Sequence, residues 1–303
     1  MDGIFNVLKP PGMTSHDVVG ALRKILQMKK IGHAGTLDPM AAGVLPVFTG
    51  NATRFLEYAA HHEKSYRAEL TFGCRTDTGD TEGKVIAKSP VHTLPLSQVQ
   101  AALDTFVGHT TQVPPMYSAI SVNGKKLYKL ARQGIEIARP ARPIFIPALT
   151  IVDYTGAQLV FDVTCSKGTF IRTLCEDIAR KLNMEGTMSF LLRRRAGAFT
   201  LENAHLLEEI AADPAGCCLS LDLVLEQFPV IKVNTLQGRR IAQGVATTVP
   251  GVAVSDGTLY QIRTWDGVLL GLAIGKEGRL RAHKIIRVPE KQDEEWNETD
   301  QNA

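Results

Sequence analysis

The first clear pattern along the chain is the alternation of apolar and polar side chains that marks half-buried β-strands. Two segments show it plainly, SYRAELTFG (65–73) and LVFDVTCSKG (159–168). Every second side chain is apolar in each of them, which predicts one buried face per strand. The residues on these two faces are Tyr66, Ala68, Leu70 and Phe72 in the first segment, and Leu159, Phe161, Val163 and Cys165 in the second.

A helical period appears in two other places. SHDVVGALRKILQMKK (15–30) repeats apolar residues every three or four positions, and Ser15 fits an N-cap. After Gly168 the period changes from two to about 3.6, which predicts a helix following the second strand. The apolar positions of the two helices are Val19, Leu22, Ile25 and Leu26, and Ile171, Leu174, Ile178 and Leu182. Strands and helices thus alternate irregularly, which favours an α+β fold built on a mixed β-sheet.

The pattern changes again near residue 229, where short strands predominate. TLYQIRTWDGVLLGLAIG (258–275) is typical of a hairpin, since Asp266-Gly267 suits a tight two-residue turn. Glu277-Gly278 offers a second turn before RLRAHKIIRV. We therefore predict a large domain over 1–228 and a small β domain over 229–288. The remaining 289–303 is too polar and acidic to bury, and we expect it to be disordered.

Composition excludes several classes of protein. The chain has 303 residues, of which 44% are hydrophobic and 21% charged, as in ordinary globular proteins. We find no signal peptide and no apolar stretch long enough to span a membrane. The five cysteines form no CxxC pair, so we expect reduced thiols in a cytoplasmic protein and no zinc site.

Common cofactor motifs are also missing. The chain contains no GxxxxGK[ST], GxGxxG, GxSxG or HExxH, so neither a nucleotide cofactor nor a metal is expected. The acidic stretch DTGDTEG (77–83) has the wrong spacing for a calcium loop and favours a polar turn. If the protein is an enzyme, it works with its side chains alone.

The distribution of charge points to a polyanionic partner. The formal net charge is +3, but the tail from residue 289 carries −5, which leaves +8 on residues 1–288. Positive residues gather in GKKLYKLARQGIEIARPAR (124–142) and in an arginine run at 193–195. Either cluster alone also fits a solvated surface. Two clusters in one chain favour contacts with nucleic-acid phosphates.

One carboxylate stands alone in an uncharged, glycine-rich stretch. Asp38 lies in GHAGTLDPMAAGVL (32–45), and Pro39 follows it directly. Asp followed by Pro is typical of a helix start, so an N-cap is one interpretation. A catalytic carboxylate is the other, and this stretch alone does not decide between them.

Six segments taken in order resemble a known family. They are GHAGTLDPMAAGVL, KSY (64–66), GCRTDTGDTEG, QVPPMYSAISVNGKKLYKLARQGIEI, SKGTFIR and LLRRRAG. Together they are similar to the TruB family of tRNA pseudouridine synthases, and the similarity runs from about residue 2 to 223. The resemblance implies a pseudouridine-synthase-like mixed sheet with flanking helices. It also implies an RNA-clamping insertion at 117–143, and the terminal β domain is similar to a PUA-like RNA-binding module.

The resemblance also implies an activity. Members of this family isomerise uridine 55 in the T loop of tRNA, without a cofactor. We therefore expect a cytoplasmic, cofactor-free isomerase that binds the T arm of tRNA as a monomer. Two alternatives remain, namely a non-catalytic tRNA-binding or tRNA-folding protein and a guide-RNA-dependent pseudouridine synthase.

The same resemblance assigns roles to individual residues. It makes Asp38 the catalytic carboxylate, Arg172 its ion-pair partner and Tyr66 the aromatic ring that packs on a flipped base. From the residues alone, Arg172 could equally pair with Glu176, and Tyr66 could simply belong to the core. A buried carboxylate needs such a cation to stay ionised. The pattern does not say whether Asp38 attacks C1′ or C6 of the nucleotide or removes the C2′ proton.

Further residues match the family's substrate-contacting positions, which are His33, Phe170, Leu192 and Lys9. His33 also fits a residue that satisfies loop backbone, and Lys9 fits a brace for that loop. Phe170 replaces the usual tyrosine of KGTYIR, so a hydroxyl there is not essential to the assignment. The cations expected on the RNA backbone are Lys125, Lys126, Lys129, Arg132, Arg193 and Arg194.

Overall fold

The computed structural model describes residues 1–60, 62–122 and 124–289. The chain divides into two compact units. The larger comprises Phe5–Val47 and Ala59–Cys217, and the smaller comprises Met1–Ile4, Phe48–Tyr58 and the chain from Cys218 onward. The segment 218–228 thus groups with the small C-terminal sheet, and the boundary at 228 stays a prediction. All but the first residue of the predicted tail 289–303 lies outside the described residues.

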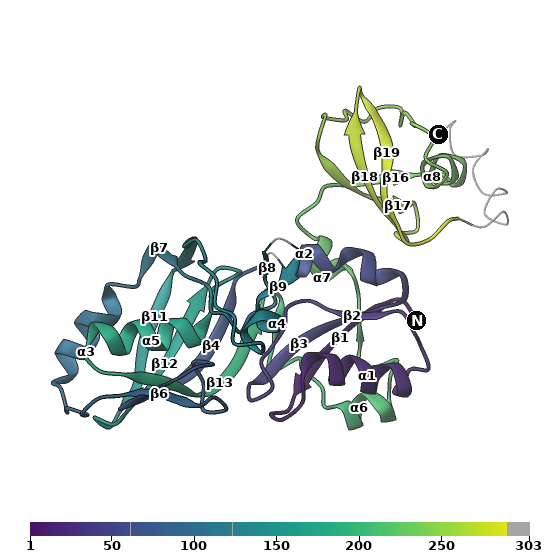
Figure 1. The fold of residues 1–303 in the computed structure, drawn as a ribbon. Coiled ribbons are helices and arrows are strands. Elements are labelled where there is room, and N and C mark those ends of the chain that lie inside the picture. Colours follow the sequence, from purple (N-terminus) through teal and green to yellow (C-terminus); the bar gives the residue numbers. More distant parts are fainter. Residues whose placement is uncertain (61, 123, 290–303) are drawn as a thin grey trace. The chain divides into compact units, whose positions relative to one another are not determined.

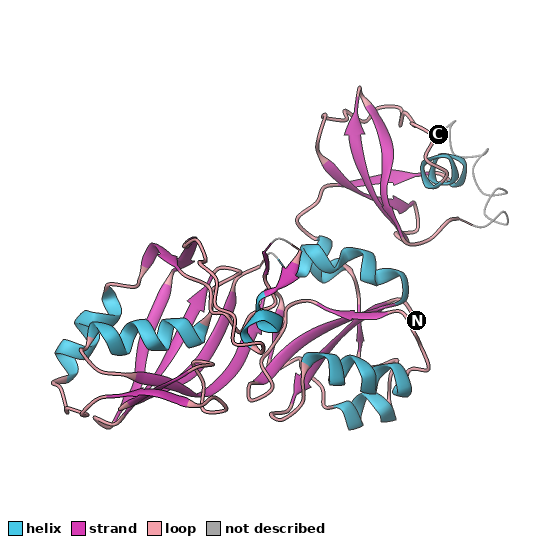
Figure 2. Ribbon diagram, in the orientation of Figure 1, coloured by secondary structure: helices cyan, strands magenta, loops and turns pink. Residues whose placement is uncertain are grey.

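A mixed β-sheet forms the framework of the molecule (Figures 1 and 2). In the described part of the chain it has nine strands, with the order β11-β12-β4-β13-β3-β1-β15, and with β14 and β2 attached to β13 and β3. Strand β13 is antiparallel to β4 but parallel to β3, which makes the sheet mixed. The strands are β1 (Gly3–Lys9), β2 (Ile31–His33), β3 (Ala42–Thr49), β4 (Lys64–Phe72), β11 (Ala148–Tyr154), β12 (Gln158–Cys165), β13 (Gly186–Ala196), β14 (Phe199–Thr200) and β15 (Cys218–Leu219).

The two strands predicted from alternation are β4 and β12, and both predictions are confirmed. They pair with each other antiparallel, and their predicted apolar faces are buried in one core. Helices α3 (Leu96–Asp104) and α5 (Ile171–Lys181) supply the other side of this core (Figure 1). The polar face of the same strands carries an ion pair between Arg67 and Asp162. Alternation therefore fixed which side of the sheet became the interior.

The predicted N-terminal helix is α1 (Ser15–Ile25), and its cap differs from the prediction. Thr14, not Ser15, is the N-cap, because its side chain accepts from the Asp17 N–H while the Asp17 carboxylate accepts from the Thr14 N–H. Ser15 is buried and bonds elsewhere, to the backbone of Leu37. The helix predicted after Gly168 is α5, with Ile171, Leu174 and Ile178 buried as expected.

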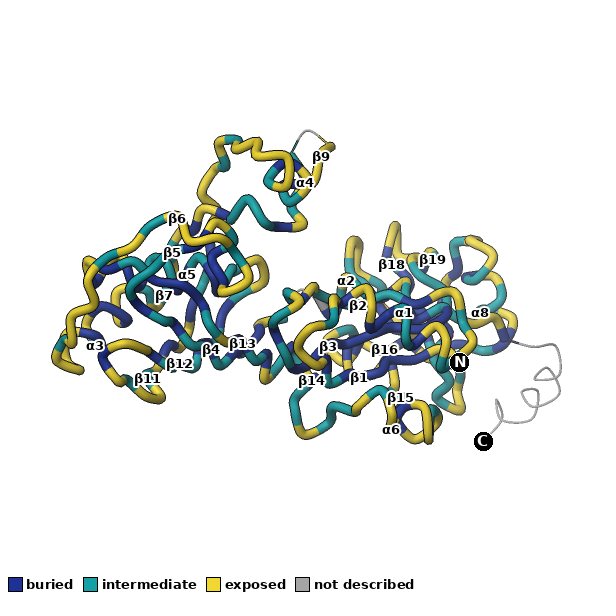
Figure 3. Tube along the Cα trace, turned by 60° about the horizontal axis from the view of Figure 1, so that its bottom comes forward, coloured by how far each residue is buried: buried dark blue, intermediate teal, exposed yellow. Residues whose placement is uncertain are grey.

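Shorter elements complete the description. The remaining helices are α2 (Leu56–Ala60), α4 (Leu127–Ala131), α6 (Leu207–Ala212), α7 (Asp222–Leu225) and a 3₁₀ helix (Gly50–Phe55). Three small two-stranded sheets pair β5 (Cys74–Thr76) with β6 (Val85–Lys88), β7 (Gly108–Gln112) with β10 (Arg142–Ile146), and β8 (Ser121–Val122) with β9 (Lys125–Lys126). The last pair and α4 belong to the predicted insertion 117–143, which Figure 3 draws as largely exposed.

The small C-terminal sheet has its own core. It has the order β16 (Val230–Val233), β17 (Leu259–Thr264), β18 (Leu269–Lys276) and β19 (Arg279–Ile285), with α8 (Thr235–Ala242) packed against it. The predicted hairpin is β17–β18, and Gly267 has the left-handed φ of 89° that its turn requires. Glu277 and Gly278, with φ of 53° and 68°, form the second predicted turn. No helix within the described ranges is both long and apolar enough to cross a membrane.

Candidate active site

Asp38 lies in the loop between β2 and β3. The N-cap interpretation of Asp38-Pro39 is wrong, because the chain makes a turn, in which the Ala41 N–H bonds the Asp38 carbonyl at 3.1 Å, and then enters β3. Strand pairing explains this outcome, since Ala42 and Gly43 pair with Leu192 and Arg193 of β13. Asp38 is half-buried, so its carboxylate is partly open to a ligand.

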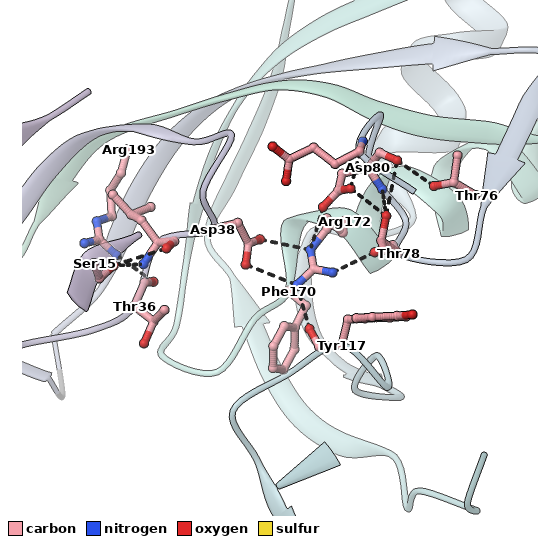
Figure 4. A network of polar contacts seen from close by, with 12 residues as sticks. Ser15, Thr36, Asp38, Thr76, Thr78, Asp80, Tyr117, Phe170, Arg172 and Arg193 are labelled. Atoms are coloured by element: carbon pink, nitrogen blue, oxygen red, sulfur yellow. Dashed lines mark hydrogen bonds and ion pairs between the residues drawn. The ribbon is translucent and has the colours of Figure 1, made fainter. Parts of the chain in front are cut away.

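Arg172, in the first turn of α5, meets this carboxylate. Its Nε lies 2.9 Å from Asp38 Oδ2, and its Nη2 donates to Asp38 Oδ1 at 3.3 Å (Figure 4). The Arg172 side chain is 7% exposed and that of Asp38 31%. A two-point contact of this kind fixes the orientation of the carboxylate. The alternative ion pair with Glu176 is not formed among the described residues.

The other donors of Arg172 bind two further segments. Nη1 donates to the Thr78 carbonyl at 2.6 Å, and Nη2 donates to the Tyr117 carbonyl at 2.8 Å. Asp80 adds a second carboxylate, with Oδ2 3.8 Å from Arg172 Nε and a side chain that is 7% exposed. The catalytic arginine expected from the sequence is therefore fixed from three directions.

The contact of Asp80 with Arg172 was not anticipated from the sequence. DTGDTEG does make a polar turn, in which Asp80 Oδ1 accepts from the Thr78 hydroxyl at 2.6 Å and from the Glu82 N–H at 3.2 Å. The turn also carries Asp80 to Arg172, which lies 92 positions away in the sequence. The local pattern predicts the turn but carries no signal for that partner.

Lys9 and Ser15 hold the backbone of the Asp38 loop. Lys9, at the end of β1, is fully buried, and its Nζ donates to the carbonyls of Pro39 at 3.2 Å and Ala41 at 2.6 Å. Burial lowers the pKa of Lys9 to about 8, although the nearby Asp38 acts in the opposite direction. Ser15 Oγ bonds both the N–H and the carbonyl of Leu37. The structure thus places Lys9 as a brace of the loop.

Arg193 requires a correction. It was expected to contact RNA phosphates, but it is 1% exposed and points into the protein. Its guanidinium donates to the carbonyls of Val44 at 2.7 Å, Gly35 at 3.1 Å and Thr36 at 3.4 Å. In β13 its side chain shares the inward face with Leu191, two positions before it. The neighbouring Arg194 is exposed and pairs with Asp162 at 2.6 Å.

Three expected substrate-contacting residues lie near the loop. Tyr66 is 8% exposed and belongs to the same core cluster as Leu37, and burial raises the pKa of its phenol to about 12. Leu192 is half-buried and pairs with Ala42 at the start of β3. Phe170 is the residue before α5, and it is half-buried.

The buried Gln112, a residue that sequence reasoning did not single out, fixes the Phe170 backbone. Its side chain accepts from the Phe170 N–H at 2.8 Å and donates to the Phe170 carbonyl at 3.0 Å. This pair of bonds resembles the ladder contact of a strand. Because Phe170 precedes Arg172 by two positions, Gln112 also helps to set where α5 begins.

His33 contacts another imidazole, and the cations of the basic insertion lie on the surface. His33 ends β2, and its ring meets that of His16 edge to face with centroids 5.6 Å apart. Burial lowers the pKa of His33 below its usual value of 6.5, which favours the neutral ring at pH 7. In the insertion the cations Lys125, Lys126, Lys129 and Arg132 are all exposed. Among the described residues no cluster of three His, Cys, Asp or Glu side chains is arranged to hold a metal ion.

Comparison with known proteins identifies the family. Residues 23–171 match the model of the TruB family pseudouridylate synthase (N terminal domain). Over 287 residues the chain is 41% identical to the tRNA pseudouridine synthase B of Caldanaerobacter subterraneus subsp. tengcongensis, covering 94% of this chain and 99% of that one. The chain belongs to the TruB family. Another member, the tRNA pseudouridine synthase B of Symbiobacterium thermophilum, is 48% identical over 252 residues, which cover 82% of this chain and 84% of that one.

Solved structures agree with the TruB assignment at the level of the fold. The structure of a Cbf5-Nop10-Gar1 complex matches with a TM-score of 0.72 at 24% identity, over 94% of this chain and 85% of that chain. A structure of an H/ACA RNP bound to a substrate RNA containing 2′-deoxyuridine matches with a TM-score of 0.68 at 23% identity, over 96% and 86%. The predicted α+β pseudouridine synthase fold is therefore confirmed. As a TruB member, the protein is a pseudouridine synthase, which is an isomerase.

Proposed function

We propose that this enzyme converts uridine 55 in the T loop of tRNA to pseudouridine, with Asp38 as the catalytic carboxylate and Arg172 as the cation that holds it ionised. The base is flipped out of the loop and packs beside Tyr66. The observation that carries the proposal is the two-point contact of a buried guanidinium with a carboxylate that remains 31% exposed. The names of the relatives, tRNA pseudouridine synthase B, support tRNA as the substrate.

The reaction asks for few groups. The N1–C1′ bond of uridine breaks, a C5–C1′ bond forms, and the proton on C5 leaves while N1 gains one, so the net change is an isomerisation. An ionised carboxylate serves either as a nucleophile or as a base in such a sequence. Arg172 offers Asp38 a buried positive charge and two N–H donors, which orient the carboxylate. Asp80 adds negative charge behind Arg172, which keeps the guanidinium in place.

The surroundings of Asp38 suit a reaction that water must not intercept. Leu37 and Ala41, on either side of it, are buried in the same cluster as Tyr66. A flipped base loses its stacking in the RNA, and an aromatic face compensates for part of that loss. With a pKa of about 12, Tyr66 stays protonated at neutral pH and acts through its ring and its neutral hydroxyl.

Two surfaces supply binding energy in this proposal. The insertion 117–143 presents Lys125, Lys126, Lys129 and Arg132 to phosphates, and the exposed Arg194 extends the cationic surface on β13. The small C-terminal sheet is also basic, with nine lysines and arginines against three acids over 229–289. We propose that this sheet acts as a PUA-like RNA-binding module.

The decisive experiment is Asp38→Asn, which keeps the size of the side chain and removes its charge. Pseudouridine formation is measured in single turnover with an unmodified tRNA transcript, and tRNA affinity is measured separately. We expect the rate to fall by about a thousand-fold or more, because the acid–base or nucleophilic group is lost. Affinity should change by less than about 3-fold, since no phosphate contact is removed.

Two controls accompany this variant. Asp104→Asn makes the same change at an exposed position at the end of α3, and it should keep the wild-type rate. A transcript with cytidine at position 55 should give no product with the wild-type enzyme. A wild-type rate for Asp38→Asn would refute the catalytic assignment and favour a protein that binds or folds tRNA.

A further inference from the structure

We propose that Arg193 is a positioning residue, whose guanidinium holds the backbone of the loop carrying Asp38 in the geometry that the reaction needs. The inference rests on the proposed role of Asp38. It also separates Arg193 from Arg194, although the two are adjacent in an arginine run. The argument depends on which atoms Arg193 contacts, on its burial without an acid, and on the rest of the loop.

Arg193 contacts backbone carbonyls on both sides of Asp38 in the sequence. Its guanidinium bonds the carbonyls of Gly35 and Thr36, before Asp38, and its Nε bonds that of Val44, after Asp38. One planar group therefore joins the two ends of the loop. In Figure 4, Arg193 and Thr36 lie on one side of Asp38 and Arg172 lies on the other. A lysine has a single nitrogen and does not reproduce this fork.

The burial of this charge is unusual. Arg193 is 1% exposed, and none of the ion pairs within the described residues includes it. Burial lowers its pKa, and the Tyr66 side chain is the group that acts against this effect. Taking an unpaired cation out of water is unfavourable, and an apolar side chain of similar size would avoid that penalty. The carbonyls of Gly35 and Thr36 in the loop and of Val44 in β3, together with the Tyr66 side chain, offset part of this penalty.

Other groups take up the rest of the loop backbone. Ser15 bonds Leu37, and Lys9 bonds the carbonyls of Pro39 and Ala41. At the end of the loop, Gly43 has φ of +109°, and a Cβ there would lie 2.2 Å from the carbonyl oxygen of Arg193. The backbones of β3 and β13 are therefore in close contact at Gly43 and Arg193. The loop is held along its whole length, while the Asp38 carboxylate itself is left to Arg172.

This arrangement predicts an effect on the rate and not on RNA binding. The Arg193 side chain is too deeply buried to contact a phosphate of the RNA. Loss of its three contacts frees the loop to shift, and a shift of about 1 Å in a reacting group can cost about 100-fold in rate. The affinity for tRNA, set elsewhere, should be unchanged.

The test compares Arg193→Met, Arg193→Lys and Arg67→Met. Arg67 is the control because it lies on the adjacent strand opposite Leu192, with its guanidinium on the exposed face of the sheet. The single-turnover rate at saturating tRNA transcript and the Kd for that transcript are measured for each variant. Hydrogen exchange over 34–44 reports on the loop itself.

We expect Arg193→Met to slow the saturated rate by about 100-fold with Kd within about 2-fold of wild type. Arg193→Lys should recover part of the loss, to about 5- to 20-fold below wild type, because it keeps the charge but not the fork. Arg67→Met should stay within about 2-fold in both quantities. Exchange should accelerate over 34–44 in Arg193→Met and not across the rest of the sheet.

A wild-type rate in folded Arg193→Met would overturn the inference, as would a weakened Kd with an unchanged saturated rate, or unchanged exchange over 34–44. If Arg193→Met fails to fold, Arg193→Lys decides by the same criteria. Asp38→Asn belongs in the same series. If that variant keeps its activity, the proposed function fails. If it loses activity while the Arg193 variants keep theirs, only the role of Arg193 fails.

Discussion

The loop that carries Asp38 and the basic insertion both depend on cations, but they use them in opposite ways. Around the loop, Lys9 and Arg193 are buried and donate to backbone carbonyls. In the insertion, Lys125 and Lys129 are exposed. A reacting carboxylate must be fixed to within a fraction of an ångström, whereas phosphates can be met by mobile charges. The difference teaches that charge clusters in a sequence need a burial argument before they are assigned to RNA.

The largest effect is expected from a change at Arg172, which contacts the carboxylate of the rigidly held Asp38 loop. Arg172→Lys keeps a positive charge but loses the contacts with Thr78 and Tyr117 and the two-point contact with Asp38. We expect the saturated rate of pseudouridine formation to fall by about 100-fold or more, because a lysine does not reproduce the two-point contact and a shift of about 1 Å in a reacting group can cost about 100-fold in rate. Affinity for tRNA should stay within about 3-fold.

Arg180→Lys is the matched control for this change. Arg180 lies on the same helix and is exposed, and within the described part of the chain its guanidinium forms one ion pair, with Asp177 three positions before it. It should retain the wild-type rate. A small effect of Arg172→Lys, similar to that of the control, would mean that the position of the guanidinium is unimportant.

Changes in the basic insertion should weaken tRNA affinity and leave the saturated rate intact, which is the opposite of the effect expected at Arg172. Replacing Lys125, Lys126 and Lys129 by Gln removes three charges without touching the Asp38 loop. We expect tRNA affinity to fall about 10- to 30-fold, and the slope of log affinity against log salt to decrease by about two to three. The rate at saturating tRNA should be almost unchanged.

The same number of exposed lysines elsewhere provides the comparison. Lys84, Lys88 and Lys181 are exposed and lie outside the proposed RNA surface. Their replacement by Gln should leave the salt dependence close to that of the wild type. Equal losses in the two triple variants would show that net charge, and not the insertion, governs binding.

Lys9, which holds the Asp38 loop, should have a smaller effect, seen in how protein stability depends on pH. Its pKa is about 8 in the folded protein against 10.5 for an ordinary lysine. Between these values the unfolded chain holds a proton that the folded protein has released, so the contribution of Lys9 to the free energy of unfolding rises with pH. Lys9→Met should therefore weaken the rise in stability between pH 7.5 and 9.5 in urea titrations. Lys64, whose pKa is also about 8, should act in the same direction as Lys9.

The smallest effect is expected at Phe170. Phe170→Tyr restores the tyrosine typical of the family, while the two backbone bonds with Gln112 do not involve the ring. The aromatic face is kept, so the single-turnover rate should stay within about 3-fold of wild type. A gain of 10-fold or more would show that a hydroxyl at this position takes part in the reaction.

Much of the framework was predictable from side-chain periodicity. Alternation placed Tyr66 and Leu70 on the inner face of β4, and the helical period after Gly168 located α5. These predictions hold because burial of one face dominates the energetics of both elements. Asp266-Gly267 was predictable for a different reason, since few residues adopt the backbone of a tight turn.

Contacts between segments far apart in the sequence were harder to predict. Asp38-Pro39 has the composition of a helix start, but pairing of β3 with β13 overrides that local preference. Asp80 lies in a stretch whose local pattern indicates only a turn. The meeting of Asp38 with Arg172 was implied by family resemblance and not by periodicity.

The burial of Arg193 in the arginine run could have been predicted from the alternation of side chains along a strand. Leu191 and Arg193 are two positions apart on one strand, so alternation alone places them on the same face. Leu191 is buried, and Arg193 follows it inward. Composition favoured three equivalent surface cations, whereas strand geometry separates Arg193, the first arginine of LLRRRAG, from the exposed Arg194.

The Arg172 side chain joins parts of the chain that are 134, 94 and 55 positions away from it. No local folding unit contains all of these partners. The enzyme therefore gains its chemistry only once the β2–β3 loop, the turn after β5 and the start of the insertion have each reached their final places. Turnover is thus a sensitive gauge of native assembly, and a preparation in which any one of these three segments is nicked or misplaced should be inactive even when most of its secondary structure persists.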